Sequence, residues 1–344
     1  MHRMELPRKV VIGRDAIKVL GKEAREAGER RALVVTSETP LKVAGSSIMD
    51  SLEGEGVGCQ ICKVGKPSTI DDAQPIIDSL KSTGTKLVVA VGGGRVIDVA
   101  KVAVSRSGAK FFSVPTTASH DGICSPLVSF PSSDRRYSFY AATPTEIIAD
   151  TKIIANSPYR LTASGCGDVM AKLTAVREWR LSHLLRAEYA ATLAETSVSM
   201  VVENSEIIRT GSEAGVRVVM EALIHCGIII SVAGSSRPCS GSEHLFSHAL
   251  DVLCEKPALH GEQVGVGTIM MAYLHGADWK LVRDTLKKVG APTNCRELGI
   301  DEETVVKALV MAHTIRPDRY TILGEKGLSV EAAENLVEVS GVAG

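Results

Sequence analysis

Two patterns of hydrophobic residues divide the chain near residue 155. Before it, short runs of β-branched residues alternate with longer segments whose apolar residues are spaced as in helices. Such runs predict strands of a parallel sheet, because each intervening segment is long enough for the helical crossover that parallel strands need. The predicted strands are 9–12, 32–36, 57–64, 86–91 and 110–114, and the predicted crossover helices are 15–28, 41–52, 70–83 and 95–105.

The pattern changes after a last predicted pair of short strands between residues 137 and 148, with Thr143 and Pro144 as their turn. Beyond residue 155, apolar residues recur at intervals of three and four, as at Leu173 and Val176, which predicts helices. The expected fold is an α/β N-terminal domain with a Rossmann-like parallel sheet, residues 1–155, followed by an all-α C-terminal domain, residues 156–344. We expect a ligand between the two domains, a common place for cofactor clefts.

Composition narrows the classes of function. The 39 Lys and Arg residues are balanced by 40 Asp and Glu residues, so no basic field attracts nucleic acid or a membrane surface. The richest apolar stretch, 218–233, contains Glu221 and His225, and the first residues form no apolar signal segment, so we expect neither membrane insertion nor secretion. Eight scattered cysteines are typical of a reducing compartment, and we expect a cytoplasmic protein.

A glycine-rich loop follows the fourth predicted strand. The run 87–91 leads directly into Gly92, Gly93 and Gly94, and the residues after them are spaced as in a helix. Glycine lets the backbone approach a pyrophosphate closely, and N–H groups at a helix start favour its negative charge. A tight turn is the other interpretation. The standard Rossmann fingerprint is absent, since Ile97 occupies the place of its third glycine.

A second group of candidate residues lies in the predicted helical part. His244 and His248 are four residues apart, so a helix places both imidazoles on one face, and His260 begins a further predicted helix. Asp168, which follows two glycines at an expected helix start, is the carboxylate best suited to join them. Asp168 with two histidines would make a three-ligand site with an open position, the pattern of catalytic zinc. The alternatives are histidines that are ordinary satisfied polar groups and an aspartate that caps a helix.

Five motifs follow one another along the chain: 91–94 with Asp98 and Lys101, 115–122, 165–168, His244 with His248, and 260–262. Their order resembles the dehydroquinate synthase-like superfamily, which includes glycerol dehydrogenase and the iron-dependent alcohol dehydrogenases. Three further strings, 119–122, 156–161 and 316–323, look most like the archaeal sn-glycerol-1-phosphate dehydrogenases. The resemblance covers nearly the whole chain.

Carried over by position, the metal ligands of the superfamily are Asp168, His244 and His260. The iron-dependent alcohol dehydrogenases have a fourth ligand, a histidine one helical turn after the aspartate, and this chain has Lys172 there. The resemblance therefore implies zinc with three ligands. Lys172 would lie on the same helix face as Asp168, where it either meets the substrate phosphate or is simply solvated.

The same resemblance implies NADPH or NADH as cofactor. Ser37 lies at the end of the second strand, where glycerol dehydrogenase has an aspartate that would bond the adenosine 2′-OH and repel a 2′-phosphate. Serine does neither, so we expect NADPH to be accepted as well as NADH, although the adjacent Glu38 could restore a preference for NADH. The other expected cofactor contacts are Gly92, Gly93, Gly94, Asp98, Thr116, Thr117, Ser119 and Ser125.

The activity implied by the resemblance is the zinc-dependent reduction of dihydroxyacetone phosphate by NAD(P)H to sn-glycerol 1-phosphate, the backbone of archaeal membrane phospholipids. Zinc would polarise the substrate carbonyl, and His248 would deliver a proton directly or through water. Asp121 would contact the substrate or the nicotinamide ribose. Arg316 and Arg319 either hold phosphate or tie down the C-terminal helices. We expect a homo-oligomer that acts on a small molecule.

Three other functions remain open from the sequence. A glycerol dehydrogenase would act on an unphosphorylated polyol, so dependence on the substrate phosphate distinguishes it. A dehydroquinate synthase-type lyase uses NAD only transiently and would consume no net NADH. A nucleotide-binding module with structural histidines would be folded and free of metal.

Overall fold

A parallel sheet forms the core of the first part of the chain. The computed structural model describes residues 4–65, 69–131, 136–182 and 188–344. The six strands of this sheet lie in the order β1, β8, β5, β4, β2, β3, and all neighbours are parallel. Their bounds are β1 Lys9–Gly13, β2 Arg31–Thr36, β3 Gly58–Lys63, β4 Leu87–Gly92, β5 Lys110–Pro115 and β8 Glu146–Asp150.

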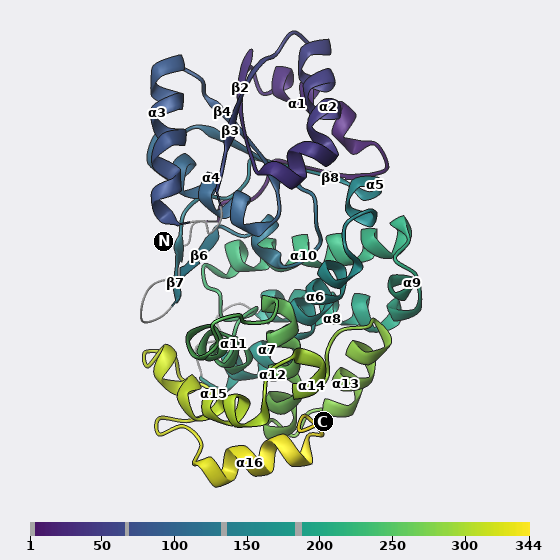
Figure 1. Ribbon diagram of the computed structural model, residues 1–344, viewed down its shortest axis with the longest axis vertical. Coiled ribbons are helices and arrows are strands. Elements are labelled where there is room, and N and C mark those ends of the chain that lie inside the picture. The colour runs from purple at the N-terminus through teal and green to yellow at the C-terminus, as the bar shows by residue number, and fades with distance from the viewer. Residues whose placement is uncertain (1–3, 66–68, 132–135, 183–187) are drawn as a thin grey trace.

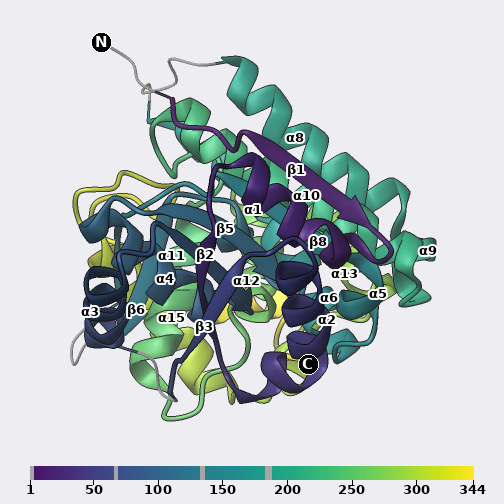
Figure 2. The same cartoon turned by 90° about the horizontal axis from the view of Figure 1, so that it is seen from above.

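Helices cover both faces of the sheet (Figures 1 and 2). Along β2, Leu33 and Val35 belong to one hydrophobic cluster and Ala32 and Val34 to another, as the alternation of a strand requires. Helices α3 and α4 pack in the first cluster, and α1 and α2 in the second. The five strands and four crossovers expected from the hydrophobic runs are confirmed. The crossover elements are η1 Ala16–Val19, α1 Leu20–Glu26, α2 Glu38–Gly54, η2 Ile70–Asp72, α3 Ala73–Thr83 and α4 Gly94–Ser107.

Two short strands lie between residues 136 and 150, as expected, but the pairing expected between them is wrong. Strand β7 (Arg136–Tyr140) pairs with β6 (Leu127–Pro131) in a separate antiparallel ribbon that the sequence analysis missed. Strand β8 instead lies between β1 and β5, because its apolar residues are buried on both faces of the parallel sheet. Thr143 and Pro144 therefore lie in the loop that connects β7 of the ribbon to β8 of the parallel sheet, and they do not form a hairpin turn. A short helical turn, η3 (Asp121–Ile123), precedes the ribbon.

After β8, every secondary-structure element among the described residues is a helix. This helical part lies below the α/β part in Figure 1, and the boundary placed at residue 155 stays a prediction. Helix α10 is the one described helix that is long and apolar enough to cross a membrane, but 67% of its apolar window is buried inside the protein, as in a core helix. The helices are α5 Thr151–Ala155, α6 Tyr159–Met170, α7 Lys172–Leu181, α8 Glu188–Glu203, α9 Ser205–Arg209, α10 Glu213–Ala233, α11 Ser242–Leu253, α12 His260–Leu274, α13 Trp279–Lys288, α14 Cys295–Leu298, α15 Glu302–Ile315 and α16 Val330–Val339.

Candidate active site

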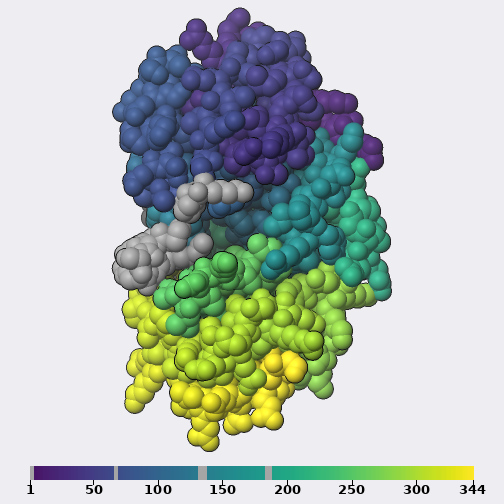
Figure 3. Space-filling view, viewed as in Figure 1, coloured from purple at the N-terminus to yellow at the C-terminus, as the bar shows by residue number. Residues whose placement is uncertain are grey.

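A cavity of about 900 Å³ lies between the carboxyl ends of the parallel strands and the helical part. Figure 3 shows the surface recessed between these two parts. The ends of β2, β4 and β5 are level in the sheet register, so the residues that follow them, Ser37, Gly93 and Thr116, line one wall. The chain continues from β2 to one side of the sheet and from β4 to the other. Open α/β sheets bind ligands at such a point.

The glycine loop is shaped by close packing. Gly93 is the N-cap of α4 and Gly94 is its first residue. None of the three consecutive glycines has a positive φ, so a tight turn does not by itself require them. A Cβ on Gly94 would lie 1.8 Å from Nε2 of His120, and a Cβ on Gly92 would lie 2.9 Å from Cβ of Val96. The three glycines therefore add no side chains of their own where α4 begins, as a phosphate cradle requires, and the His120 ring packs against Gly94.

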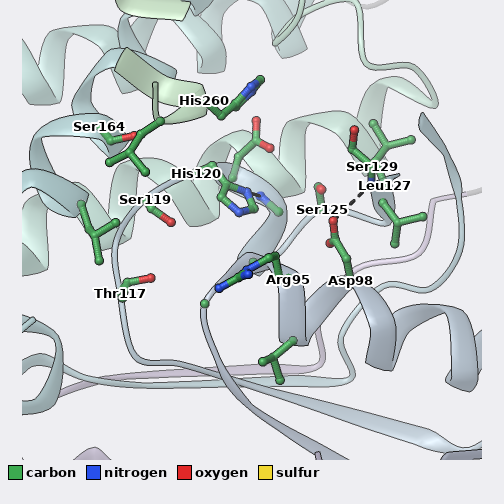
Figure 4. Close-up of a pocket in the computed structure, with 18 of the residues that line it drawn as sticks. Arg95, Asp98, Thr117, Ser119, His120, Ser125, Leu127, Ser129, Ser164 and His260 are labelled. Carbon is green, nitrogen blue, oxygen red and sulfur yellow. Dashed lines mark hydrogen bonds between the residues drawn. The ribbon is translucent and has the colours of Figure 1, made fainter. Parts of the chain in front are cut away.

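The expected cofactor contacts surround this cavity, with Gly92 as the exception. Figure 4 shows several of them with His120 and Arg95, which also line it. Asp98 accepts a hydrogen bond from the Ser129 backbone N–H at 3.2 Å and lies 3.4 Å from Nζ of Lys101. Their roles as cofactor contacts stay predictions. The predicted contacts on the wall are Ser37, Gly93, Gly94, Asp98, Thr116, Thr117, Ser119 and Ser125.

The end of β2 presents a hydroxyl to the cavity. Ser37 lines the wall, whereas the Glu38 carboxylate lies 2.9 Å from Nζ of Lys42, and both of these side chains are largely exposed. Glu38, the first residue of α2, is absent from the wall. This arrangement favours acceptance of a 2′-phosphate, because no negative charge opposes it there.

Three candidate metal ligands converge from three helices. Asp168 comes from α6, His244 from α11 and His260 from α12, and one donor atom of each lies within 4.8 Å of the other two. Nε2 of His244 is 3.4 Å from Oδ1 of Asp168, and the two imidazole centroids are 5.2 Å apart. Both histidines line the cavity. One carboxylate and two imidazoles are a donor set that fits a zinc ion with its remaining position open to the cavity.

The protonation states of this cluster also fit a cation. Burial would raise the pKa of Asp168, but the Lys172 ammonium and the hydrogen bond from His244 hold it well below its usual value. Burial, followed by the charge of His244, lowers the pKa of His260 well below its usual value. Burial also disfavours a charged His244, yet its hydrogen bonds to Asp168 and Glu243 raise its pKa. Nε2 of His244 faces Oδ1 of Asp168, and a metal ion would take the place of a proton between them.

The position of Asp168 within α6 corrects one expectation. Asp168 lies near the C-terminal end of α6, so it is not an N-cap, and the glycines before it do not start the helix. They allow close packing instead, since a Cβ on Gly167 would lie 2.0 Å from the carbonyl oxygen of Gly261. Helices α6 and α12 therefore meet backbone to backbone, which brings Asp168 beside His260, the first residue of α12.

Lys172 has different surroundings from either of those expected. Its side chain is completely buried, and it is not part of the cavity wall. Its Nζ lies 2.7 Å from the carbonyl oxygen of Asp168, 3.0 Å from Oδ1 of Asp168 and 3.1 Å from Oδ2 of Asp121. These three acceptors use all three donors of an ammonium. Lys172 therefore does not reach the cavity, contrary to the expected contact with the substrate phosphate, and its observed contacts hold two carboxylates in place.

Asp121 and His248, the expected catalytic residues, both line the cavity. The backbone N–H of Asp121 donates to Oδ2 of Asp168 at 2.8 Å. The His248 ring stacks on that of His260 at 5.8 Å with an interplanar angle of 22°, and its Nδ1 is 3.7 Å from Oδ2 of Asp251. Both residues thus contact the three candidate ligands without belonging to that group, and their catalytic roles stay predictions.

Glu243 was not singled out by the sequence analysis. It is completely buried, and its Oε1 lies 2.9 Å from Nδ1 of His244. The Thr174 hydroxyl donates to Oε2 at 2.8 Å, and the Gly241 N–H donates to Oε1. A carboxylate on the far nitrogen of a metal-binding histidine orients the ring and strengthens it as a ligand. A glutamate directly before a candidate ligand in an apolar helix was the signal available in the sequence.

We expect Glu243→Gln to weaken zinc binding by about 10- to 100-fold, because His244 loses its charged partner. Calorimetric titration of zinc into chelator-treated protein measures this. Glu206→Gln is the control, since that side chain is 82% exposed and far along the chain from the cluster. Equal zinc affinity in the wild type and Glu243→Gln would contradict the orienting role.

Known proteins resemble this chain in sequence. A model of the iron-containing alcohol dehydrogenase family matches residues 11–158. The chain is 48% identical to a Thermococcus kodakarensis protein named glycerol-1-phosphate dehydrogenase (NAD(P)+), with 99% of both chains covered. This chain belongs to the glycerol-1-phosphate dehydrogenase family. It is also 47% identical to the Pyrococcus horikoshii protein of the same name, over 99% of this chain and 100% of that one.

Solved structures resemble this fold as well. The glycerol dehydrogenase of Schizosaccharomyces pombe superposes with a TM-score of 0.82 at 21% identity, covering 99% of this chain and 90% of that one. At this identity the similarity concerns the fold alone. The family and the fold expected from the sequence motifs are thus both confirmed.

Proposed function

We propose that this chain reduces dihydroxyacetone phosphate to sn-glycerol 1-phosphate with NADPH or NADH, using zinc held by Asp168, His244 and His260. The observation that carries the proposal is that the three-donor cluster and the glycine loop open into one cavity. A cofactor on the loop and a substrate at the cluster would then be neighbours. The names of the Thermococcus and Pyrococcus relatives agree with this reaction.

The residues of the cavity provide what hydride transfer to a carbonyl needs. When bound, zinc supplies Lewis-acid polarisation of the carbonyl and the nicotinamide supplies the hydride. The Lys172 ammonium keeps Asp168 and Asp121 in place, and burial of that ammonium is offset by these two carboxylates, which raise its pKa well above the usual value. The contacts of Asp121 let it orient the substrate or the ribose beside the cluster.

His248 is the proposed proton donor to the product oxygen, either directly or through a water. It lies on the cavity wall one helical turn from His244 and against His260. From there its ring reaches the space in front of the cluster without serving as a ligand. A neighbouring carboxylate, Asp251, helps to set the orientation of the ring.

We expect His248→Ala to lower kcat by about 100-fold, since a positioned general acid contributes roughly 10²- to 10⁴-fold. Zinc content and the KM for NADPH should stay within about twofold, because the ligands and the glycine loop are unchanged. His225→Ala, at an exposed position on α10, is the control. Full turnover by His248→Ala across the pH range would remove the acid role.

The reaction itself is tested by the oxidation of NADPH and of NADH with dihydroxyacetone phosphate. Purified protein is assayed as isolated, after chelation and after zinc is restored. We expect metal-dependent oxidation of both nucleotides, because the wall after β2 carries a neutral serine. Unphosphorylated dihydroxyacetone should react far more slowly. A stereospecific coupled enzyme then identifies the enantiomer of the product.

Other outcomes of this assay point elsewhere. Equal rates with phosphorylated and unphosphorylated substrate would favour a glycerol dehydrogenase. No net oxidation of either nucleotide by the zinc-loaded protein would exclude the proposed reaction and leave the lyase or the binding module.

We further propose a homo-oligomer in the cytoplasm. All eight cysteines are free, in keeping with a reducing compartment. A monomer in size-exclusion chromatography with light scattering would contradict the oligomer.

A further inference from the structure

Arginines gather at the helical end of the cavity. Arg237 follows α10, while Arg316 and Arg319 follow α15. Burial, together with the charges of Arg316 and Arg237, lowers the pKa of Arg319 to about 10, so it is still a cation at neutral pH. Arg316 and Arg319 line the cavity, as do Ser236 and Ser240 from the loop between α10 and α11.

The guanidinium of Arg319 donates hydrogen bonds to uncharged oxygen atoms. Its Nη1 donates to the carbonyl oxygen of Ser240 at 2.6 Å and to the hydroxyl at 3.2 Å, and its Nη2 donates to the Ser236 hydroxyl at 2.6 Å. No carboxylate of the described residues forms an ion pair with it, whereas Arg316 pairs with the exposed Asp318 at 3.3 Å. A partly buried cation beside two others is costly unless an anion joins them.

The other cations near the cavity are differently placed. Lys172 is buried and saturated by acceptors, and Lys101 donates to the carbonyl oxygens of Gly122 and Leu127. Arg95 follows the glycine loop, at the end of the cavity where the cofactor is proposed. Arg319 instead contacts Ser240, four residues before His244, and so lies on the side of the metal cluster.

We propose that Arg319 and Arg316, with the hydroxyls of Ser236 and Ser240, form the subsite for the phosphate group of a triose phosphate. The planar guanidinium suits two phosphate oxygens. Each serine hydroxyl accepts from Arg319 and keeps its own proton to donate to a phosphate oxygen. This assignment rests on the proposed function. It places the substrate phosphate on Arg319 and Arg316 and not on Lys172.

The test compares a phosphorylated with an unphosphorylated substrate. In Arg319→Ala, we expect the KM for dihydroxyacetone phosphate to rise about 100-fold, as for loss of a charge-assisted pair. The kcat/KM for dihydroxyacetone and the KM for NADPH should stay within about twofold. Inorganic phosphate should compete with dihydroxyacetone phosphate in the wild type and much less in the variant. Arg319→Lys should lie between the two.

Arg237→Ala is the matched control, because Arg237 belongs to the same group, bonds the carbonyl oxygen of Tyr320 at 3.2 Å and is not on the cavity wall. Its KM for dihydroxyacetone phosphate should change less than about threefold. Equal losses with both substrates in Arg319→Ala would mean a structural role and overturn the subsite. If that variant does not fold, Arg319→Lys and Arg316→Ala decide by the same ratio.

The failures of the two proposals are distinguishable. An active Arg319→Ala with an unchanged KM for dihydroxyacetone phosphate would overturn the subsite alone. A zinc-loaded wild type that does not reduce dihydroxyacetone phosphate would overturn the proposed function and the subsite with it.

Discussion

Asp168→Asn is expected to abolish zinc binding and to lower kcat by about 10³-fold or more. The amide is a poorer ligand than a carboxylate, and Lewis-acid catalysis contributes several kcal/mol at roughly 1.4 kcal/mol per tenfold. The change also leaves the buried Lys172 ammonium with one carboxylate fewer. Metal analysis of the purified variant and its kcat with dihydroxyacetone phosphate measure both effects.

Asp284→Asn is the control for this substitution, since its side chain is 64% exposed and pairs only with the neighbouring Arg283 among the ion pairs of the described residues. It should keep zinc and turnover. Circular dichroism shows whether Asp168→Asn is folded, which separates loss of the metal from loss of the fold. An Asp168→Asn protein with full zinc content and full activity would show that the ligand set is wrong.

Gly167→Ala is expected to destabilise the protein by about 3 kcal/mol and to weaken zinc binding. The new Cβ would lie 2.0 Å from the carbonyl oxygen of Gly261 and 3.0 Å from its carbonyl carbon, so two helix backbones must separate. Overpacking of a tight interior costs roughly 1–3 kcal/mol, and rigid backbone puts this site at the upper end. Separating α6 from α12 also moves Asp168 away from His260. Urea unfolding and zinc titration measure the two effects.

Gly54→Ala is the matched control, because Gly54 is also in a helix, α2, and its Cβ would meet nothing within 4 Å. Alanine there should be neutral or should stabilise by up to about 1 kcal/mol. Equal unfolding free energies for the two variants would contradict the close packing of α6 on α12.

The parallel sheet was predictable because its strands are buried on both faces and must therefore be continuous apolar runs. The same rule explains the error at β8, whose run was recognised while its partners were not. Its neighbours β1 and β5 are distant in sequence, and a pattern within the chain does not specify them. The β6–β7 ribbon is not predicted for a similar reason. Strand β7 is one of the expected short strands, but its partner β6 is short and only partly apolar.

At the candidate site, the sequence indicated the ligand types but not their surroundings. The spacing of His244 and His248 placed both on one helix face, and the structure leaves only His244 in the three-donor cluster. Lys172 was expected to reach substrate or solvent, yet Asp121 joins Asp168 around its ammonium. That ion-pair group depends on the approach of η3 to α6, a contact between segments far apart in the chain.

The βαβ order, the glycine loop, the three candidate ligands and the family can all be read from the amino-acid sequence. These depend on spacing along the chain and on residue types, which a linear pattern contains. Three other features become visible only in the folded chain. Gly167 packs against α12, Glu243 contacts His244, and Arg319 has no carboxylate ion-pair partner among the described residues. Each of these depends on which side chains and backbones meet when separate helices pack, and packing is determined by the whole fold at once.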